Sequence, residues 1–185
     1  MQVDCSHLAE DWLQTPLGEA LLQREARVVE EALDGIFGEE CLQLGMWGER
    51  RTFMRFTRTQ RCSLIAQSAA GEPCAVGELH KLPVESDSID AVLLPHTLDF
   101  SDRPHAILRE VDRVLRANGH IVILGFKPAG LWGLRRLIPG AGMPPGADHL
   151  ISERRLRDWL QLLDMRIQGV TRYFFRWPLP RNKVS

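Results

Sequence analysis

The stretch from Leu82 to Phe126, LPVESDSIDAVLLPHTLDFSDRPHAILREVDRVLRANGHIVILGF, decides the fold that this sequence predicts. Two short runs in it, 89–94 and 121–124, are apolar at nearly every position, as parallel strands buried on both faces are. Between them, apolar side chains recur on one face of a helix, and the charged residues of 109–113 are assigned to its solvent-facing surface. We therefore expect a strand, a right-handed crossover helix and a second parallel strand.

The ends of this helix carry their own signals. Pro104 suits the first helical turn, and Ser101 or Asp102 can cap it. Asn118 and Gly119 favour a left-handed stop at the other end. The helix is therefore expected to end at this turn, just before the second strand begins.

The bulk composition limits the classes of protein. The chain of 185 residues suits one domain with a full core, and its net charge of -1 argues against nucleic acid as a partner. No apolar run approaches the roughly 20 residues of a membrane span, and the first residues show no signal-peptide pattern. We expect a cytoplasmic protein that does not enter a membrane; the composition specifies no oligomeric state.

The cysteines and histidines show no metal-binding pattern. Cys5, Cys41, Cys62 and Cys74 have no C-x-x-C spacing, and the six histidines do not cluster with them. Buried free thiols are the preferred interpretation, with a zinc site or a disulfide as the alternatives. We predict no metal.

The N-terminal part, residues 1–38, is expected to form an arm and a helix that pack on a single domain running from 39 to 185. Residues 7–13 are interpreted as an irregular arm that places Trp12 against the body. Thr15 and Pro16 begin a helix that Gly35 ends. The predicted apolar face of this helix consists of Leu17, Leu21, Val28, Ala32 and Leu33.

The rest of the chain alternates between predicted strands and helices. Strands are expected at 41–44, 62–67 and 74–76, with a short helix within 50–61. Downstream, 128–137 reads as an amphipathic segment, and the loop 139–147 as a lid or a disordered connection. Ser152 is expected to cap a helix that buries Trp159 and Leu160, and 166–175 to form a last strand.

This order of elements, with several local motifs, resembles the class I S-adenosylmethionine-dependent methyltransferases, especially their type 11 group. The motifs are ELHKLP at 78–83, SIDAV at 88–92, REVDRVL at 109–115 and GHIVI at 119–123. More narrowly, TPLG at 15–18, LQLGMWG at 42–48 and LWGLRR at 131–136 are similar to a bacterial subgroup of uncharacterised methyltransferase-like proteins. The resemblance implies a three-layer, doubly wound α/β fold of the Rossmann-like kind, with a mostly parallel sheet whose final antiparallel strand is missing or truncated. It also implies S-adenosylmethionine as cofactor.

The resemblance assigns the cofactor turn to residues that depart from the family pattern. Gly45 corresponds to the first glycine, which faces the methionine part of the cofactor, and Met46, Trp47 and Gly48 continue the turn, with Trp47 in place of the second glycine. Gln67 stands near the position where the family has an acid that binds the ribose hydroxyls. Because a hydrogen bond to a charged group is worth about 1.5–3 kcal/mol, against about 1 for a neutral one, this exchange corresponds to a tenfold or larger fall in affinity.

The next two strand ends complete the implied site. Glu78 matches the acid that hydrogen-bonds the adenine amino group, and Leu79 matches the apolar residue that packs on the purine. Pro95, His96 and Thr97 occupy the loop that faces the transferred methyl. His96 is the candidate catalytic base, and the alternative is a histidine that only hydrogen-bonds the loop backbone.

Methyl transfer from a sulfonium is an in-line displacement, for which a protein supplies mainly position and dry surroundings. The sequence therefore favours a methyltransferase that acts on a small-molecule acceptor. The alternative is a methyltransferase-like binding or interaction protein that has lost turnover, favoured by Gln67 in place of the ribose acid and by the incomplete glycine turn. A dinucleotide-dependent oxidoreductase fits less well, because no G-x-G-x-x-G opens a helix.

Overall fold

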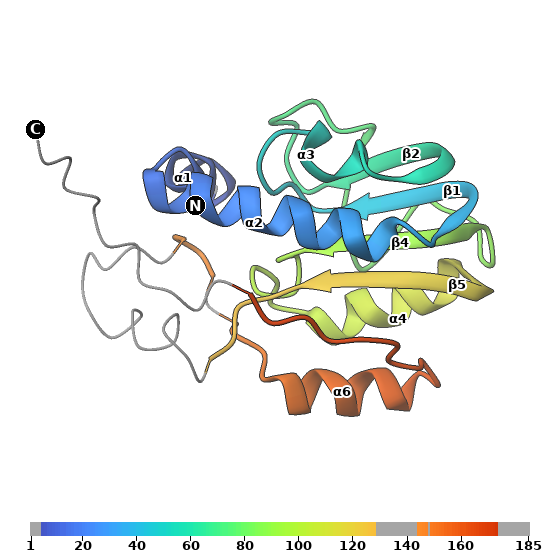
Figure 1. Cartoon of the computed structure of the whole chain (residues 1–185). Helices are drawn as coiled ribbons and strands as arrows, with labels where there is room; N and C mark the ends of the chain where they lie inside the picture. The colour runs from blue at the N-terminus through green and yellow to red at the C-terminus, as the bar shows by residue number, and fades with distance from the viewer. Residues whose placement is uncertain (1–4, 129–143, 148, 174–185) are drawn as a thin grey trace, which may run out of the picture.

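A five-stranded parallel sheet with the strand order β3-β2-β1-β4-β5 forms the centre of the computed structural model, which describes residues 5–128, 144–147 and 149–173. The strands are β1 (Phe37–Leu44), β2 (Arg58–Ala66), β3 (Ala75–Val76), β4 (Ile89–Pro95) and β5 (Leu115–Leu124). Each neighbouring pair is parallel, and Figure 1 shows the arrowheads of β1, β4 and β5 pointing to the same side. The carboxyl ends of the strands therefore share one edge.

Helices cover both faces of this sheet. Helices α1 (Cys5–Leu13) and α2 (Pro16–Leu33) belong to one face, and α4 (Pro104–Val114) and α6 (Glu153–Leu162) to the other (Figure 1). The short helix α3 (Arg51–Met54) connects β1 to β2. This is the three-layer α/β arrangement that the sequence predicts. Among the described residues, no helix combines the length and apolar character needed to cross a bilayer.

Two hydrophobic clusters lie on opposite faces of the sheet, because successive side chains of a strand point to opposite sides. In β1, Leu42 and Leu44 pack in the cluster under α4 and α6, whereas Cys41 packs in the cluster under α1 and α2. In β4, Leu94 and Leu93 divide in the same way. Burial on both faces explains why the strand sequences are continuously apolar rather than alternating.

The predicted helix starts are confirmed at two places. The Thr15 hydroxyl accepts a hydrogen bond from the Gly18 amide at 3.2 Å, and the Ser152 hydroxyl accepts one from the Arg155 amide at 3.3 Å. Trp12 is buried, as expected, but the segment that carries it is helix α1 and not an irregular arm. The first two helices are therefore both part of the layer that covers the sheet.

The central helix begins at Pro104, as predicted, but its predicted N-cap and C-terminal stop are wrong. The N-cap of α4 is Arg103, without a side-chain cap, and the Ser101 hydroxyl accepts a hydrogen bond from the Arg103 amide while Asp102 does not cap the helix. The helix ends at residue 114 and passes directly into β5, so Asn118 and Gly119 lie within a strand. Leu115 pairs with Ile89 and residues 120–124 pair with 91–95, so these two residues lie in the register irregularity between the two paired stretches.

Other predicted boundaries also change. The segment 50–61 is helical only over α3, because β2 already begins at residue 58 beside β1. In α2 the buried valine is Val29 and not Val28, and Ala32 is exposed. Residues 166–173 form no strand. The remainder of that expected strand, the amphipathic segment after residue 128 and most of the loop 139–147 lie outside the described residues.

Two charged residues of α4 hold the loop between β3 and β4, which corrects their assignment to a solvated surface. The Glu110 carboxylate accepts a hydrogen bond from the Leu82 amide at 2.8 Å, and the Arg113 guanidinium donates to the Val84 carbonyl at 2.9 Å. The Glu110 and Arg113 side chains also pair with each other at 2.7 Å. The motifs ELHKLP at 78–83 and REVDRVL at 109–115 therefore contact each other in the structure.

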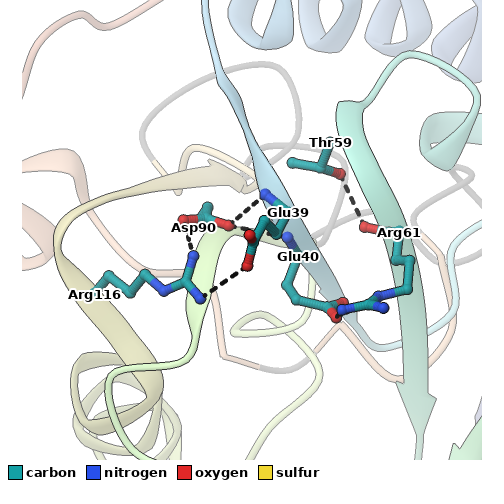
Figure 2. A network of polar contacts seen from close by, with 6 residues as sticks. All are labelled: Glu39, Glu40, Thr59, Arg61, Asp90 and Arg116. Atoms are coloured by element: carbon teal, nitrogen blue, oxygen red, sulfur yellow. Dashed lines mark hydrogen bonds and ion pairs between the residues drawn. The ribbon is translucent and has the colours of Figure 1, made fainter.

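A second polar network fastens β1, β4 and β5 at the amino edge of the sheet (Figure 2). The Asp90 carboxylate accepts hydrogen bonds from the amides of Glu39 and Glu40 at 2.7 and 2.9 Å, and from Arg116 at 2.6 Å. A Cβ on Gly38 would come within 2.5 Å of the Asp90 side chain, so only glycine fits there. This network lies at the opposite end of the strands from the predicted site.

Candidate functional site

The turn after β1 begins the candidate site. Gly45 and Gly48 have φ values of 84° and 75°, a left-handed conformation that glycine adopts without steric cost. The Gly45 amide donates to the Ile65 carbonyl at 2.8 Å, and the Thr97 hydroxyl donates to the Leu44 carbonyl. The turn is therefore tied to β2 on one side and to the loop after β4 on the other.

His96 follows β4 and lies between two carboxylates. Its Nε2 is 2.7 Å from Oε1 of Glu25, and its Nδ1 is 3.1 Å from Oδ2 of Asp99. The His96 side chain is 0% exposed, and its φ of 57° is unusual for a residue with a side chain. A strained conformation of this kind persists only where surrounding contacts hold it, and such residues concentrate at functional sites.

Further donors converge on the same two carboxylates. The Trp47 indole N–H donates to Oε2 of Glu25 at 2.8 Å, and the Tyr173 hydroxyl donates to Oε1 at 3.1 Å. The Phe126 amide donates to Asp99 at 3.0 Å. We call Glu25, His96 and Asp99 the acidic-histidine cluster. Segments from α2 and from the ends of β1, β4 and β5 meet in it, together with a residue close to the C-terminus.

The two carboxylates determine the charge of His96. Burial on its own would lower the pKa of the imidazole, but the charge of Glu25 and the hydrogen bonds to Asp99 and Glu25 raise the pKa from 6.5 to about 9. Both ring nitrogens face carboxylate oxygens, which suits an imidazolium that donates twice. At neutral pH and in this conformation His96 is therefore protonated and has no lone pair to accept a proton.

Trp47 fills the space next to the cluster. Its side chain is 2% exposed, and its ring lies 4.5 Å from that of His96 between centroids. The rings of Phe100, Phe126 and Trp12 lie 5.7, 5.9 and 6.3 Å from it. The indole thus closes the middle of the carboxyl edge from inside the protein.

The other side of the same edge carries polar groups that face solvent. Gln67 follows β2 and is exposed, and the Glu78 side chain after β3 is 67% exposed, 3.5 Å from His80. A Cβ on Gly77 would meet nothing within 4 Å, which shows open space beside the end of β3. Leu79, by contrast, is 4% exposed and packs in the cluster under α4.

The structure thus divides the sequence-predicted residues into two groups. Gly45, Trp47, Pro95 and His96 lie together at the ends of β1 and β4, with Pro95 buried as the last residue of β4. Gln67 and Glu78 lie at the ends of β2 and β3, and the Met46 side chain extends toward Gly71 in the loop between those strands. His96 bonds two carboxylates and not only the loop backbone.

Sequence reasoning missed both carboxylates of the cluster. Glu25 is 0% exposed in the middle of α2, four residues after Leu21 and four before Val29, which are both buried. A carboxylate on the apolar stripe of a helix is the signal that could have found it, because glutamate is almost never buried unless paired. Asp99 gave a weaker signal, as the acid three residues after a histidine at a strand end.

Comparison with known proteins defines the class. The profile of a family described as "Methyltransferase domain" matches residues 52–123. A structure of a SAM-dependent methyltransferase from Thermotoga maritima, described as a possible histamine N-methyltransferase, superposes with a TM-score of 0.63 at 18% identity, over 85% of this chain and 79% of that one. A SAM-dependent methyltransferase from Aquifex aeolicus gives a TM-score of 0.61 at 16% identity, over 91% and 92% of the two chains.

The chain belongs to the class I S-adenosylmethionine-dependent methyltransferase family. The chain is also 32% identical over 178 residues to "Uncharacterized protein YafS" of Escherichia coli K12, and the aligned part covers 93% of this chain and 70% of that protein. S-adenosylmethionine is the cofactor of this family.

The residues at the carboxyl edge of the sheet fit one half of this cofactor, the nucleoside. Gln67 and Glu78 offer exposed polar groups to a nucleoside, beside the open space at Gly77. Under the first glycine, Oε1 of Gln43 is a buried acceptor without a hydrogen-bond partner among the described residues, while its Nε2 donates to the Gly45 carbonyl. On the other half, the buried Trp47 indole occupies the space beside the turn. A cofactor with its methionine end at this turn would require the Trp47 indole to move.

Proposed function

We propose that this protein is a methyltransferase that transfers the methyl group of S-adenosylmethionine to a small-molecule acceptor. The proposal is carried by one observation: an open rim with the solvent-exposed carboxylate of Glu78 and a buried cluster around His96 lie on the same edge of the sheet. Ligands of open parallel sheets bind at that edge. The bound cofactor supplies an electrophilic methyl group.

The proposed role of each residue follows from its position at this edge. We assign Glu78 to the adenine amino group, Gln67 to the ribose hydroxyls and the turn Gly45–Gly48 to the methionine end. His96 is the proposed catalytic group, and it becomes able to accept a proton only when its contact with Glu25 opens. Because the His96 and Glu25 side chains are both 0% exposed, the acceptor has to be small enough to reach a buried group. We expect this reaction to take place in the cytoplasm.

The alternative function is a methyltransferase-like binding protein without turnover. Two observations favour it: Trp47 is 2% exposed, and each oxygen of Glu25 already accepts at least one hydrogen bond. A protein of this kind would keep the nucleoside rim and lose methyl transfer. Binding and turnover measured on the same sample separate the two functions.

Replacing Glu78 by alanine tests the nucleoside rim. We expect the dissociation constant of S-adenosylhomocysteine, measured by isothermal titration calorimetry, to rise about tenfold or more, because a hydrogen bond to a charged group is worth about 1.5–3 kcal/mol. Glu85→Ala, which removes an exposed carboxylate from the loop before β4, is the matched control and should bind as the wild type does.

The possible results have distinct meanings. Equal binding by the wild type and Glu78→Ala would remove Glu78 from the site and leave the cofactor assignment standing. No heat and no binding by the wild type at millimolar ligand would contradict the proposed function itself.

A further inference from the structure

Cys41 and Cys62 are neighbours on adjacent strands. They are register partners in the parallel pair β1 and β2, and both pack against the cluster under α1 and α2, so their side chains share one face of the sheet. Neighbouring strands lie about 4.8 Å apart. That spacing falls within the roughly 4.4–6.8 Å between Cα atoms that a disulfide requires.

The surroundings hold this register on both sides of the pair. Glu40 pairs with Arg61 one position earlier, and their side chains form an ion pair at 2.5 Å (Figure 2). The amide of Glu40 is also fixed by the Asp90 carboxylate. The two sulfur atoms therefore have little freedom to move apart along the strands.

The two thiols differ in environment. Cys41 is 1% exposed, whereas Cys62 is half-buried, and the structure has both as free thiols. The hydrogen bond between them lowers the pKa of Cys62 and raises the pKa of Cys41, which burial raises further. Since the thiolate is the nucleophile, Cys62 is the thiol that reacts first. Cys74, in contrast, is exposed, which corrects its prediction as a buried thiol.

We propose that Cys41 and Cys62 are an oxidant-sensitive pair that a peroxide converts into a disulfide between β1 and β2. The Cys62 thiolate attacks one oxygen of hydrogen peroxide, the O–O bond breaks, and a sulfenic acid forms while the second oxygen leaves as water after protonation. The Cys41 sulfur then displaces the sulfenic oxygen, which leaves as the second water. Two thiols and one peroxide thus give one disulfide and two waters.

This bond would join the two strands that lead to the cofactor edge. β1 ends at the turn of Gly45 and β2 ends before Gln67, and the pair lies three residues before the end of β1 and four before the end of β2. Oxidation therefore acts on the strand pair that carries the turn, without touching a residue of the proposed site.

The test uses the full chain with Cys5→Ser and Cys74→Ser, so that only the pair remains. The protein is treated with hydrogen peroxide, unfolded and then treated with N-ethylmaleimide. Mass spectrometry should show no label, a loss of two hydrogens and a peptide that contains both residues. Dithiothreitol should reverse all three changes. Adding Cys41→Ser should leave Cys62 as a sulfenic acid that dimedone traps, and adding Cys62→Ser should leave Cys41 unoxidised under the same conditions. Two labels on the peroxide-treated pair, or equal oxidation of the two single-thiol variants, would overturn the proposal.

Discussion

Replacing Glu25 by alanine is expected to lower the free energy of unfolding by about 3–5 kcal/mol, because removal of one member of a buried ion pair leaves the other charge uncompensated. The partner here is the imidazolium of His96, 0% exposed and 2.7 Å from the carboxylate. The donors Trp47 and Tyr173 lose their acceptor at the same time. Urea unfolding at pH 7, followed by circular dichroism, measures the change.

Two variants show whether charge or shape causes the loss. Glu25→Gln keeps one acceptor oxygen, enough for either Trp47 or Tyr173, and removes the charge that faces His96, so its loss should be smaller than that of the alanine variant. Glu30→Ala removes an exposed carboxylate from the same helix, and we expect a change within about 0.5 kcal/mol. If Glu25→Ala and Glu30→Ala were equally stable, the cluster would not hold α2 on the sheet.

The stability of the wild type is expected to fall as the pH rises from 6.5 to about 9. The neighbouring carboxylates raise the pKa of His96 from 6.5 to about 9, so the folded state holds its proton more tightly than the unfolded state does. The stabilisation by this group is therefore fully present below the unfolded pKa and is lost as the pH passes the folded value. One pKa unit corresponds to about 1.4 kcal/mol, which gives a total of about 3 kcal/mol.

Comparison with His96→Gln isolates this contribution. The difference in unfolding free energy between wild type and variant should shrink across the same pH range, as measured by urea unfolding at intervals of half a pH unit. Cys62 also titrates with a lowered pKa, so both proteins should carry Cys62→Ser. Parallel curves for the two proteins would show that His96 does not gain its proton affinity from folding.

The central strand-helix-strand unit and the starts of α2 and α6 could be predicted because their signals are local. Continuous apolar strands and the Thr15 and Ser152 caps depend on sequence spacing that neighbouring residues reveal. The end of α4 could not be predicted, because pairing of residue 115 with Ile89 ends the helix before Asn118 and Gly119 are reached. Tertiary contacts decided that boundary.

The site shows the same division between local and distant information. His96 was predictable as a residue at a strand end, but its protonation state depends on Glu25, 71 positions away in the chain. The burial of Trp47 likewise depends on the rings of Phe100, which follows β4, and Phe126, which follows β5. The sequence predicted the edge of the sheet at which the site lies. It did not predict the contacts between residues that are far apart in the chain.

Nuclear magnetic resonance with S-adenosylhomocysteine tests most directly whether the cofactor lies across this edge. On titration, the amide signals of Gln67 and Glu78 and the indole N–H signal of Trp47, assigned by its absence in Trp47→Phe, should shift together. The amides of Glu39 and Glu40 at the amino edge should stay in place. Signals of Trp47, Gln67 and Glu78 that remain unchanged at saturating ligand would contradict the account.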